Sequence, residues 1–398
     1  METEIIDALL TPEGRQLLAQ TRGCTPGEEL ALATRLRRDH PAELVSAALG
    51  QERLRQRARA KFGDDAERMY FTPDGVEQAT RRTVADWRAQ RFAALGVRRL
   101  ADLCGGIGGD AIALARAGIA VTAVDRDPVT CAVAAANAAA LGLADLVEVR
   151  CADVTEVDTA GYDAVFTDPA RRGARGRIFD PEAYSPPLSW AIEAGRATRF
   201  GALKVAPGIP HEAVPADAEA EWVSDGGDVK EAVLWFGTGA PADAPHRATL
   251  LGGRLPGGHS LTGGRLPDPP AGPLRRYLYE PDGAVIRAHL VAEVADLLGG
   301  ATLLDPHIAY LTSDRLTPTP YAAAYEITDE LPFNVKKLKA LLRERAVGTL
   351  VIKKRGFAVE PDELRRKLRP QGPNAAVVLL TRIGTTPVML LARELRQP

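Results

Sequence analysis

The chain has 398 residues, of which 45% are hydrophobic and 26% charged, and its formal net charge is −2. This length predicts about two or three domains, at least one with a core large enough for an enzyme. The composition is typical of a globular protein in water and excludes a disordered chain and a membrane protein. The near-neutral net charge leaves the class of partner open, because it can conceal regions of opposite charge.

The cysteines and the start of the chain indicate its compartment. Cys24, Cys104, Cys131 and Cys151 lack the C-x-x-C spacing of a zinc or redox site, and the six histidines are scattered. We therefore expect reduced thiols and no metal. The acidic N-terminus has no signal-peptide pattern, and no apolar stretch is long enough to span a bilayer. These features predict a cytoplasmic protein.

Residues 1–66 show helical periodicity and no strand-like alternation, which predicts an N-terminal helical segment. The last helix of this segment, over residues 54–62, is basic. Its cations could contact phosphate, but a solvated helix face is the favoured interpretation. The basic residues in question are Arg53, Arg55, Arg57, Arg59 and Lys61.

From about residue 97 the pattern changes to strand, glycine-rich turn, helix and strand, which predicts a βαβ unit. Further apolar runs extend it to a doubly wound, Rossmann-like α/β sheet within a domain over 67–252. The expected strands are 97–103, 119–124, 147–151, 162–167 and 202–205, with helices over 108–117 and 128–141. Residues 231–236 and 247–251 are expected to form a closing antiparallel pair.

A Gly- and Pro-rich stretch follows over about 237–275, and it contains Gly-Gly-Arg-Leu-Pro twice. Two copies do not make a repeat architecture. We expect a linker and connecting segment over 253–318, with a flap that contacts the substrate as the alternative.

Residues 319–398 alternate strand and helix patterns, which predicts a compact α+β module. Between residues 331 and 370 this module has twelve Lys and Arg residues but only four acids. Clustered cations of this kind predict salt-dependent binding to a polynucleotide backbone that does not depend on sequence.

The glycine-rich turn over 102–110 has the sequence Asp-Leu-Cys-Gly-Gly-Ile-Gly-Gly-Asp. Gly106-x-Gly108-x-x-Ala111 satisfies the dinucleotide-binding fingerprint, and Asp125 follows at about the right interval for a ribose hydroxyl. Glycines here allow the backbone to approach a ligand and turn into a helix. Because any nucleotide-like cofactor at a strand end requires this, the glycines alone do not choose the cofactor.

Charge separates the candidate cofactors. Asp102, at the end of the strand before the loop, would repel the diphosphate of a dinucleotide but attract the ammonium and sulfonium of S-adenosylmethionine (SAM). Asp125 and Asp153 follow the next two strands, where carboxylates could accept from a ribose hydroxyl and the adenine amino group. Capping of turns is the alternative for these two residues. Three acids at successive strand ends predict SAM.

The fourth strand leads into Asp168-Pro169-Ala170-Arg171 at the sheet edge where ligands of open α/β sheets bind. The lone pair of a base amine is delocalised into the ring, so its methylation is helped by acceptors that hold both N–H groups. The Asp168 carboxylate and the Pro169 carbonyl are candidates for these two acceptors.

These motifs resemble class I SAM-dependent methyltransferases over residues 68–250, and particularly the trimethylguanosine synthase-like RNA guanine-N2 methyltransferases. The resemblance lies in Tyr-Phe-Thr-Pro at 70–73, in the loop at 102–109 and in Val-Asp-x-Asp-Pro at 124–128. The C-terminal module over 319–398 resembles the THUMP-like domain that follows such methyltransferase domains, and that family is associated with RNA.

The resemblance implies that Asp168 and Pro169 face the acceptor, and Arg171 beside them completes the predicted catalytic set. However, Ala170 and Arg171 stand where the family has a second proline and an aromatic residue that stacks on the base. Arg171 could stack instead, or bind phosphate together with the neighbouring arginines of a basic loop. The predicted cofactor-binding residues are Thr72, Pro73, Asp102, Cys104, Gly105, Gly106, Gly108, Gly109, Asp110, Asp125, Arg126 and Asp153.

The sequence thus predicts a SAM-dependent methyltransferase that acts on a base amino group in RNA, with guanine N2 as one candidate target. No covalent intermediate is expected, because Cys104 is interpreted as a small residue that permits close approach of the cofactor. The alternatives are a methyltransferase of a protein or small molecule, a noncatalytic RNA-binding protein on the same scaffold, and a nicotinamide-dependent oxidoreductase. The sequence leaves the RNA species, the methylated atom and the oligomeric state open.

Overall fold

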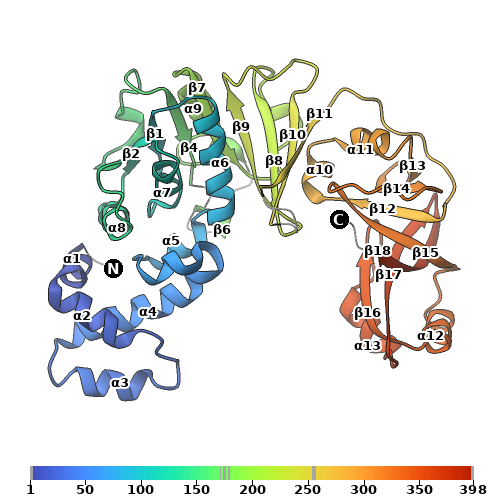
Figure 1. The fold of residues 1–398 in the computed structure, drawn as a ribbon, viewed down its shortest axis with the longest axis horizontal. Coiled ribbons are helices and arrows are strands. Elements are labelled where there is room, and N and C mark those ends of the chain that lie inside the picture. Colours follow the sequence, from blue (N-terminus) through green and yellow to red (C-terminus); the bar gives the residue numbers. More distant parts are fainter. Residues whose placement is uncertain (1–2, 171, 174–175, 178–179, 253–256, 396–398) are drawn as a thin grey trace. The chain divides into compact units, whose positions relative to one another are not determined.

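The computed structural model describes residues 3–170, 172–173, 176–177, 180–252 and 257–395, with the backbone alone for 172–173 and 176–177. The chain forms two compact units (Figure 1). The first comprises Met1–Glu219 and Ala232–Gly239, and the second comprises Ala220–Glu231 and Ala240–Pro398. Within the described residues, no helix combines the length and the apolar character needed to cross a membrane.

The first unit begins with the predicted helices. They are α1 (Thr3–Leu10), α2 (Pro12–Thr21), α3 (Glu29–Leu36) and α4 (Ala42–Phe62). Each presents an apolar stripe to a common core that contains Leu9, Leu17 and Val45. On α4, Arg53 and Arg59 form exposed ion pairs with Glu29 and Glu67, which fits a solvated helix face. Arg55 does not fit this interpretation, because it is buried and donates to the Met69 carbonyl at 2.9 Å.

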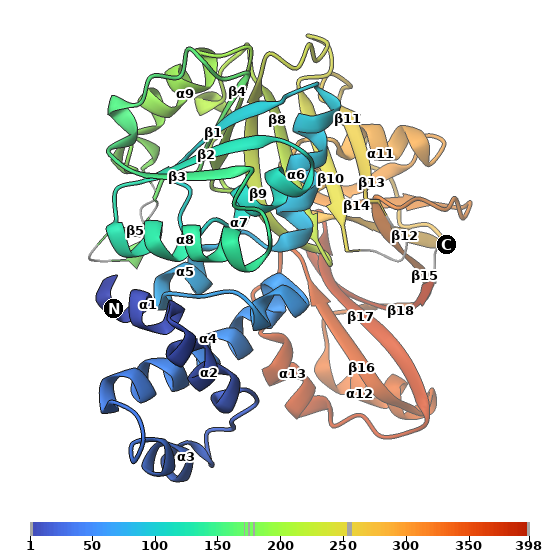
Figure 2. The same cartoon turned by 60° about the vertical axis from the view of Figure 1, so that its left-hand side comes forward.

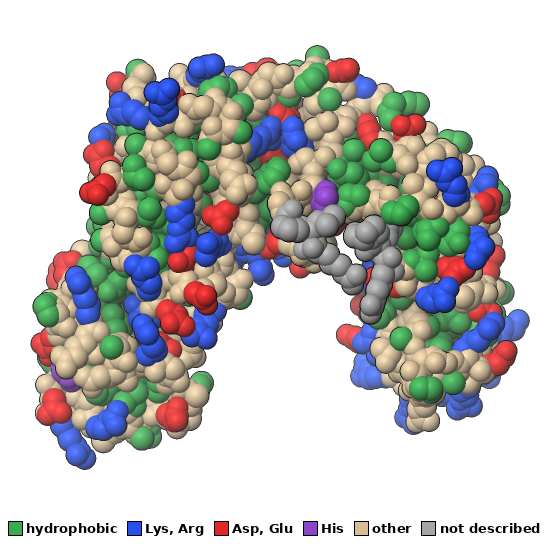
Figure 3. Space-filling view, viewed as in Figure 1, with side chains coloured by type: hydrophobic (Ala, Val, Ile, Leu, Met, Phe, Trp, Pro, Cys, Tyr) green, Lys and Arg blue, Asp and Glu red, His purple; other side chains and the backbone are tan. Residues whose placement is uncertain are grey.

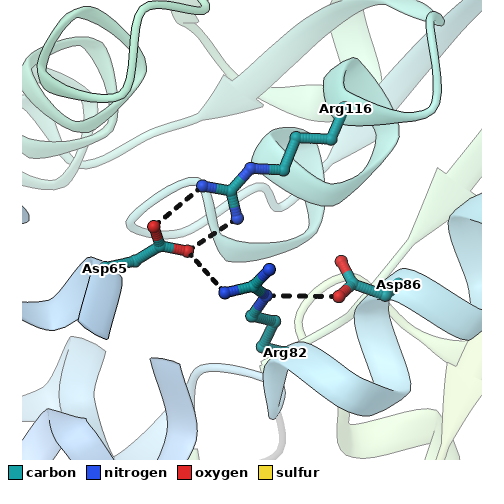
Figure 4. Close-up of polar contacts among 4 residues, drawn as sticks. All are labelled: Asp65, Arg82, Asp86 and Arg116. Carbon is teal, nitrogen blue, oxygen red and sulfur yellow. Dashed lines mark hydrogen bonds and ion pairs between the residues drawn. The ribbon is translucent and has the colours of Figure 1, made fainter. Parts of the chain in front are cut away.

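A network of ion pairs joins the end of this helical segment to the helices beside the sheet (Figure 4). Asp65, in the 3-10 turn η1 (Gly63–Glu67), accepts hydrogen bonds from Arg116 at 2.7 and 2.9 Å and from Arg82 at 3.2 Å. Arg82 also pairs with Asp86 on α6 (Arg82–Ala94). These partners lower the pKa of Asp65 and raise that of Arg116. The network therefore ties η1 to α6 and α7 (Gly109–Arg116).

The sheet of the first unit is the predicted doubly wound one. Its parallel strands lie in the order β3 (Val147–Cys151), β2 (Ala120–Asp125), β1 (Arg99–Leu103), β4 (Ala164–Thr167) and β7 (Phe200–Val205). Helices α7 and α8 (Pro128–Ala140) lie on one side of the sheet and α9 (Leu188–Arg196) lies on the other (Figure 2). The carboxyl ends of β1, β2 and β4 thus meet at one edge.

The predicted pairing of 231–236 with 247–251 is wrong. Strand β9 (Asp228–Phe236) pairs antiparallel with β7, whereas β10 (His246–Leu251) pairs parallel with β8 (Glu219–Asp225) and antiparallel with β11 (His259–Gly263). Strand β8, which the sequence pattern did not predict, is buried over most of its length. Gly226 and Gly227 join β8 to β9 with φ angles of 64° and 87°, which glycine adopts readily.

The second unit contains a sheet in the order β13-β14-β12-β15-β18-β17-β16. These strands are β12 (Tyr277–Pro281), β13 (Thr302–Asp305), β14 (Ile308–Ser313), β15 (Ala322–Pro332), β16 (Val347–Lys354), β17 (Asn374–Ile383) and β18 (Thr386–Leu395). Helices α12 (Val335–Glu344) and α13 (Pro361–Leu368) pack on it through Leu338, Leu342 and Leu364. The predicted α+β module is thereby confirmed.

The structure differs from the expectation of a linker over 253–318. This segment contains β11, β12, β13 and β14 together with two short helices, α10 (Gly283–Arg287) and α11 (Val291–Leu297). Glycines at its turns include Gly299 and Gly300, which have φ angles of 80° and 86° and connect α11 to β13. The Gly and Pro content that suggested a linker instead reflects closely spaced turns.

Candidate active site

A cavity of about 500 Å³ lies in the first unit at the carboxyl ends of β1, β2 and β4. Most residues of the predicted site line it, although they come from four separate stretches of the chain. The predicted residues in its walls are Thr72, Asp102, Cys104, Gly105, Gly106, Gly109, Asp110, Asp125, Arg126, Asp168 and Pro169. The fold therefore gathers the cofactor loop and the acceptor motif around one space.

Four predicted residues are not placed in these walls. Pro73 is the first residue of α5 (Pro73–Gln78), and Gly108 is the N-cap residue of α7. Asp153 accepts hydrogen bonds from the backbone nitrogen and the hydroxyl of Thr155, at 2.9 and 2.7 Å, and these bonds lower its pKa. It thus caps a turn, and its contact with the cofactor stays a prediction. Arg171 lies outside the described residues.

The glycine loop turns sharply into α7 through left-handed backbone conformations. Cys104, Gly106 and Gly108 have φ angles of 68°, 56° and 85°. This conformation is uncommon for a residue with a side chain such as Cys104, and residues of this kind cluster at functional sites. Burial and the nearby carboxylates of Asp168 and Asp125 raise the pKa of the Cys104 thiol far above its ordinary value. A thiolate nucleophile is therefore disfavoured at this position.

Asp102 is a buried carboxylate at the end of β1. Its residue is 1% exposed, and neither oxygen has a hydrogen-bond partner among the described residues. Burial, with the negative charges of Asp110 and Asp168, raises its pKa well above the ordinary value. A cationic ligand group beside it would offset the cost of burying this charge. The carboxylate therefore fits an ammonium group.

Asp110, whose charge acts on Asp102, forms an ion pair with a buried arginine. The guanidinium of Arg88, which α6 contributes, pairs with Asp110 and lies 4.3 Å from the ring centroid of Phe166. Arg88 is 2% exposed, so this pair is part of the protein interior. Arg88 was not predicted as a site residue, because its only signal in the sequence is a charged position within a helix.

Asp125 shapes the loop and also lines the cavity. Its Oδ2 accepts from the backbone nitrogen of Gly106 at 3.1 Å, and its Oδ1 accepts from that of Asp127 at 3.0 Å. Asp127 in turn caps α8 by accepting from Thr130 at 2.7 Å. The carboxylate of Asp125 thus fixes the glycine loop from the end of the neighbouring strand.

The acceptor motif has a partner that sequence reasoning missed. Lys204, on β7, donates from Nζ to Asp168 Oδ2 at 2.6 Å and to Thr80 Oγ1 at 2.9 Å. Lys204 is 5% exposed, yet it lines the cavity together with both partners. The sequence did contain a signal for this pair, namely a lysine inside the apolar run 202–205. Charged residues are rarely buried without a partner, so a lysine there indicates a buried ion pair.

Comparisons with known proteins give the family. Residues 97–187 match the model described as RNA cap guanine-N2 methyltransferase, and residues 322–394 match the THUMP domain-like model. Residues 2–58 match a domain of unknown function. An uncharacterized S-adenosylmethionine-dependent methyltransferase of Mycobacterium tuberculosis, found in two strains, is 36% identical over 341 residues, which covers 83% of this chain and 91% of the relative. The chain belongs to this methyltransferase family.

The methyltransferase is therefore an enzyme that uses SAM, as the sequence predicted. A solved structure of a putative methyltransferase from Porphyromonas gingivalis W83 shares its fold, with a TM-score of 0.74 at 23% identity over 96% of this chain and 99% of that one. The match supports the α/β methyltransferase fold with its additional segments. The predicted THUMP-like module is confirmed by the match over 322–394.

Proposed function

We propose that this methyltransferase methylates a base amino group in RNA, and that guanine N2 is the target. The observation that carries the proposal is the placement of Asp168 and Pro169 in the same cavity as Asp102. The matched RNA cap guanine-N2 methyltransferase model covers 97–187, which includes both the glycine loop and this acceptor motif.

The cavity residues fit the cofactor. In the proposed arrangement, Asp102 pairs with the ammonium group of SAM, the backbone of Gly105 and Gly106 approaches the cofactor, and Asp125 accepts from its ribose. Bound SAM supplies the methyl group that is transferred. Further contacts with the cofactor are proposed for Thr72, Cys104 and Arg126, because these residues line the same cavity.

The acceptor side fits an aromatic amine. Asp168 Oδ2 accepts a hydrogen bond from Lys204 at 2.6 Å, and the Asp168 side chain lines the cavity. An acceptor of this kind, together with the Pro169 carbonyl, can hold the N–H groups of a base amine and direct its nitrogen. Positioning and electrostatics then supply catalysis without a covalent intermediate.

The charge of the C-terminal module supports a polynucleotide substrate. Helices α12 and α13 contact each other and border a hollow of about 640 Å³ lined by Lys339, Arg366, Lys367 and Arg369 with Glu363. Figure 3 shows Lys and Arg side chains gathered over this end of the module. Lys336, Lys337 and Arg343 on α12 are also exposed. Cations arranged in this way bind phosphate backbones.

The test is Asp168→Ala in the full-length protein, with RNA from cells lacking the gene as methyl acceptor. We expect calorimetry to show unchanged SAM binding and nucleoside mass spectrometry to show strongly reduced transfer. Asp86→Ala is the matched control, since Asp86 lies on α6 outside the cavity walls. If wild-type enzyme methylates no RNA but modifies protein or small molecules, the proposal fails.

A further inference from the structure

A buried lysine lies beside the proposed acceptor residue. Lys204 follows Leu203 and precedes Val205 on β7, a strand that is buried throughout. A buried ammonium group is costly unless it is paired and hydrogen-bonded. Lys204 meets this requirement through Asp168 and Thr80, at 2.6 and 2.9 Å. The three side chains lie together in the cavity wall.

This contact fixes the Asp168 carboxylate from a second strand. The backbone nitrogen of Asp168 donates to the Leu103 carbonyl on β1 at 3.2 Å, and its Oδ2 accepts from Lys204 on β7. With the backbone and one carboxylate oxygen both held, the direction of the other oxygen is also set. A side chain locked by its neighbours holds a substrate more precisely than one free to rotate.

The stability of the fold gives little reason for this ion pair. Replacing a buried pair by well-packed apolar residues is often neutral or stabilising, because both charges must be removed from water. The pair lies in the cavity wall, and one of its partners belongs to the acceptor motif. Binding of the acceptor therefore explains the pair better than stability does.

We propose that Lys204 is a positioning residue that holds Asp168 as a two-oxygen acceptor, and that this acceptor selects a guanine edge over an adenine edge. The inference rests on the proposed function. It adds that Asp168, held by Lys204, is the group that distinguishes guanine from adenine. Lys204 acts through Asp168 rather than on the transferred methyl group.

The hydrogen-bonding edges of the two purines explain the selection. Guanine presents two adjacent donors, N1–H and the N2 amine, which a carboxylate can accept with its two oxygens. Adenine places the acceptor N1 beside its amine, so a second carboxylate oxygen would face a lone pair. Repulsion between the lone pairs of adenine N1 and the carboxylate oxygen disfavours adenine.

The experiment compares full-length wild type with Lys204→Met, Lys204→Arg and Lys230→Met. Lys230→Met is the matched control, because it makes the same substitution at a lysine that pairs with Asp228 and lies outside the cavity walls. RNA from cells lacking the gene is the acceptor. N2-methylguanosine and N6-methyladenosine are quantified by mass spectrometry, and SAM binding is measured by calorimetry.

We expect wild type to form N2-methylguanosine without N6-methyladenosine. Lys204→Met should lower kcat by about 100-fold, the order of loss caused by a misplaced catalytic contact, with unchanged SAM affinity. Lys204→Arg should restore part of the rate, and Lys230→Met should retain the wild-type rate. The SAM measurement separates a loss of positioning from a loss of folding.

A Lys204→Met enzyme with wild-type kcat would overturn the inference and leave the proposed function in place. N6-methyladenosine as the wild-type product would overturn both this assignment and guanine N2 as the target, and that result does not depend on whether any variant folds. A wild-type enzyme that methylates no RNA would overturn the proposed function and, with it, this assignment.

Discussion

Gly105 lies so close to Asp102 that a Cβ atom placed on Gly105 would be 3.3 Å from Asp102 Oδ2. The same atom would be 3.2 Å from the Cβ of Ala123 on β2. Both contacts are tighter than ordinary van der Waals contact, and both neighbours are held in strands or at their ends. The loop thus depends on glycine at this position to keep the buried carboxylate and the cofactor-facing backbone together.

Gly105→Ala should therefore weaken SAM binding. Crowding of this kind costs on the order of 1 to 3 kcal/mol, which corresponds to about 5- to 150-fold in the dissociation constant if the cost falls on the SAM-bound loop. Calorimetric titration with SAM measures the effect. Gly27→Ala is the control, since a Cβ there meets nothing within 4 Å. Equal SAM affinity of the two variants would contradict the prediction.

Asp102→Asn should lower SAM affinity without lowering the stability of the SAM-free protein. The burial that raises the pKa of Asp102 means that ionising it costs folding free energy at pH values above the ordinary value of 3.8. The amide variant removes this cost, so the melting temperature of the SAM-free protein at neutral pH should rise or stay level. SAM affinity should fall about 10- to 100-fold, because a charge-assisted hydrogen bond is lost. A lower melting temperature together with unchanged SAM affinity would refute this account.

Asp65 predicts part of the acid sensitivity of the first unit. Its pKa lies below 3.8 because of Arg116, so its stabilising contribution is present above that pH and is lost as the pH falls through the lowered value. Asp65→Asn should therefore lower the melting temperature at neutral pH, and the difference from wild type should shrink in strong acid. Thermal unfolding followed across the acid range tests this. A constant difference at every pH would argue against the ion pairs as its cause.

The basic surface of α12 predicts the salt dependence of RNA binding. Replacing Lys336, Lys339 and Arg343 by glutamine should weaken RNA binding and reduce the slope of log affinity against log salt by about 2 to 3. Filter binding at several salt concentrations measures the slope.

The matched control removes three exposed arginines of the N-terminal helical segment, Arg15, Arg35 and Arg38, and should leave the slope unchanged. Equal slopes for the two triple variants would show that the cations of α12 do not contact RNA.

Much of the cofactor region was predictable because its signals are local. The glycine loop, the acid at the end of β1 and the Asp168-Pro169 motif each lie within a few residues, and their chemistry follows from charge and backbone freedom. The doubly wound sheet also followed, since alternating strand and helix patterns favour it. Asp153 shows the limit of such reasoning, because an acid after a strand serves equally well as a turn cap.

The strand pairing beyond β7 was not predictable in the same way. Strand β8 has a buried Glu221 bonded to Thr249 at 2.6 Å, so its polar residues hid it from a search for apolar runs. Strand β10 pairs with β8 rather than with β9, so a prediction without β8 gives β10 the wrong partner. Pairing depends on which segments come together in space, and periodicity along the chain does not record that.

The sequence by itself determined the class of enzyme, its cofactor and the basic character of the C-terminal module, because short motifs and charge fix these properties locally. Only the tertiary structure decided the partners of the site's charged groups. Arg88 with Asp110, and Lys204 with Asp168, are separated by 22 and 36 positions in the chain. A buried charge is stabilised by whichever group the fold brings within hydrogen-bond distance, and that choice is made in space.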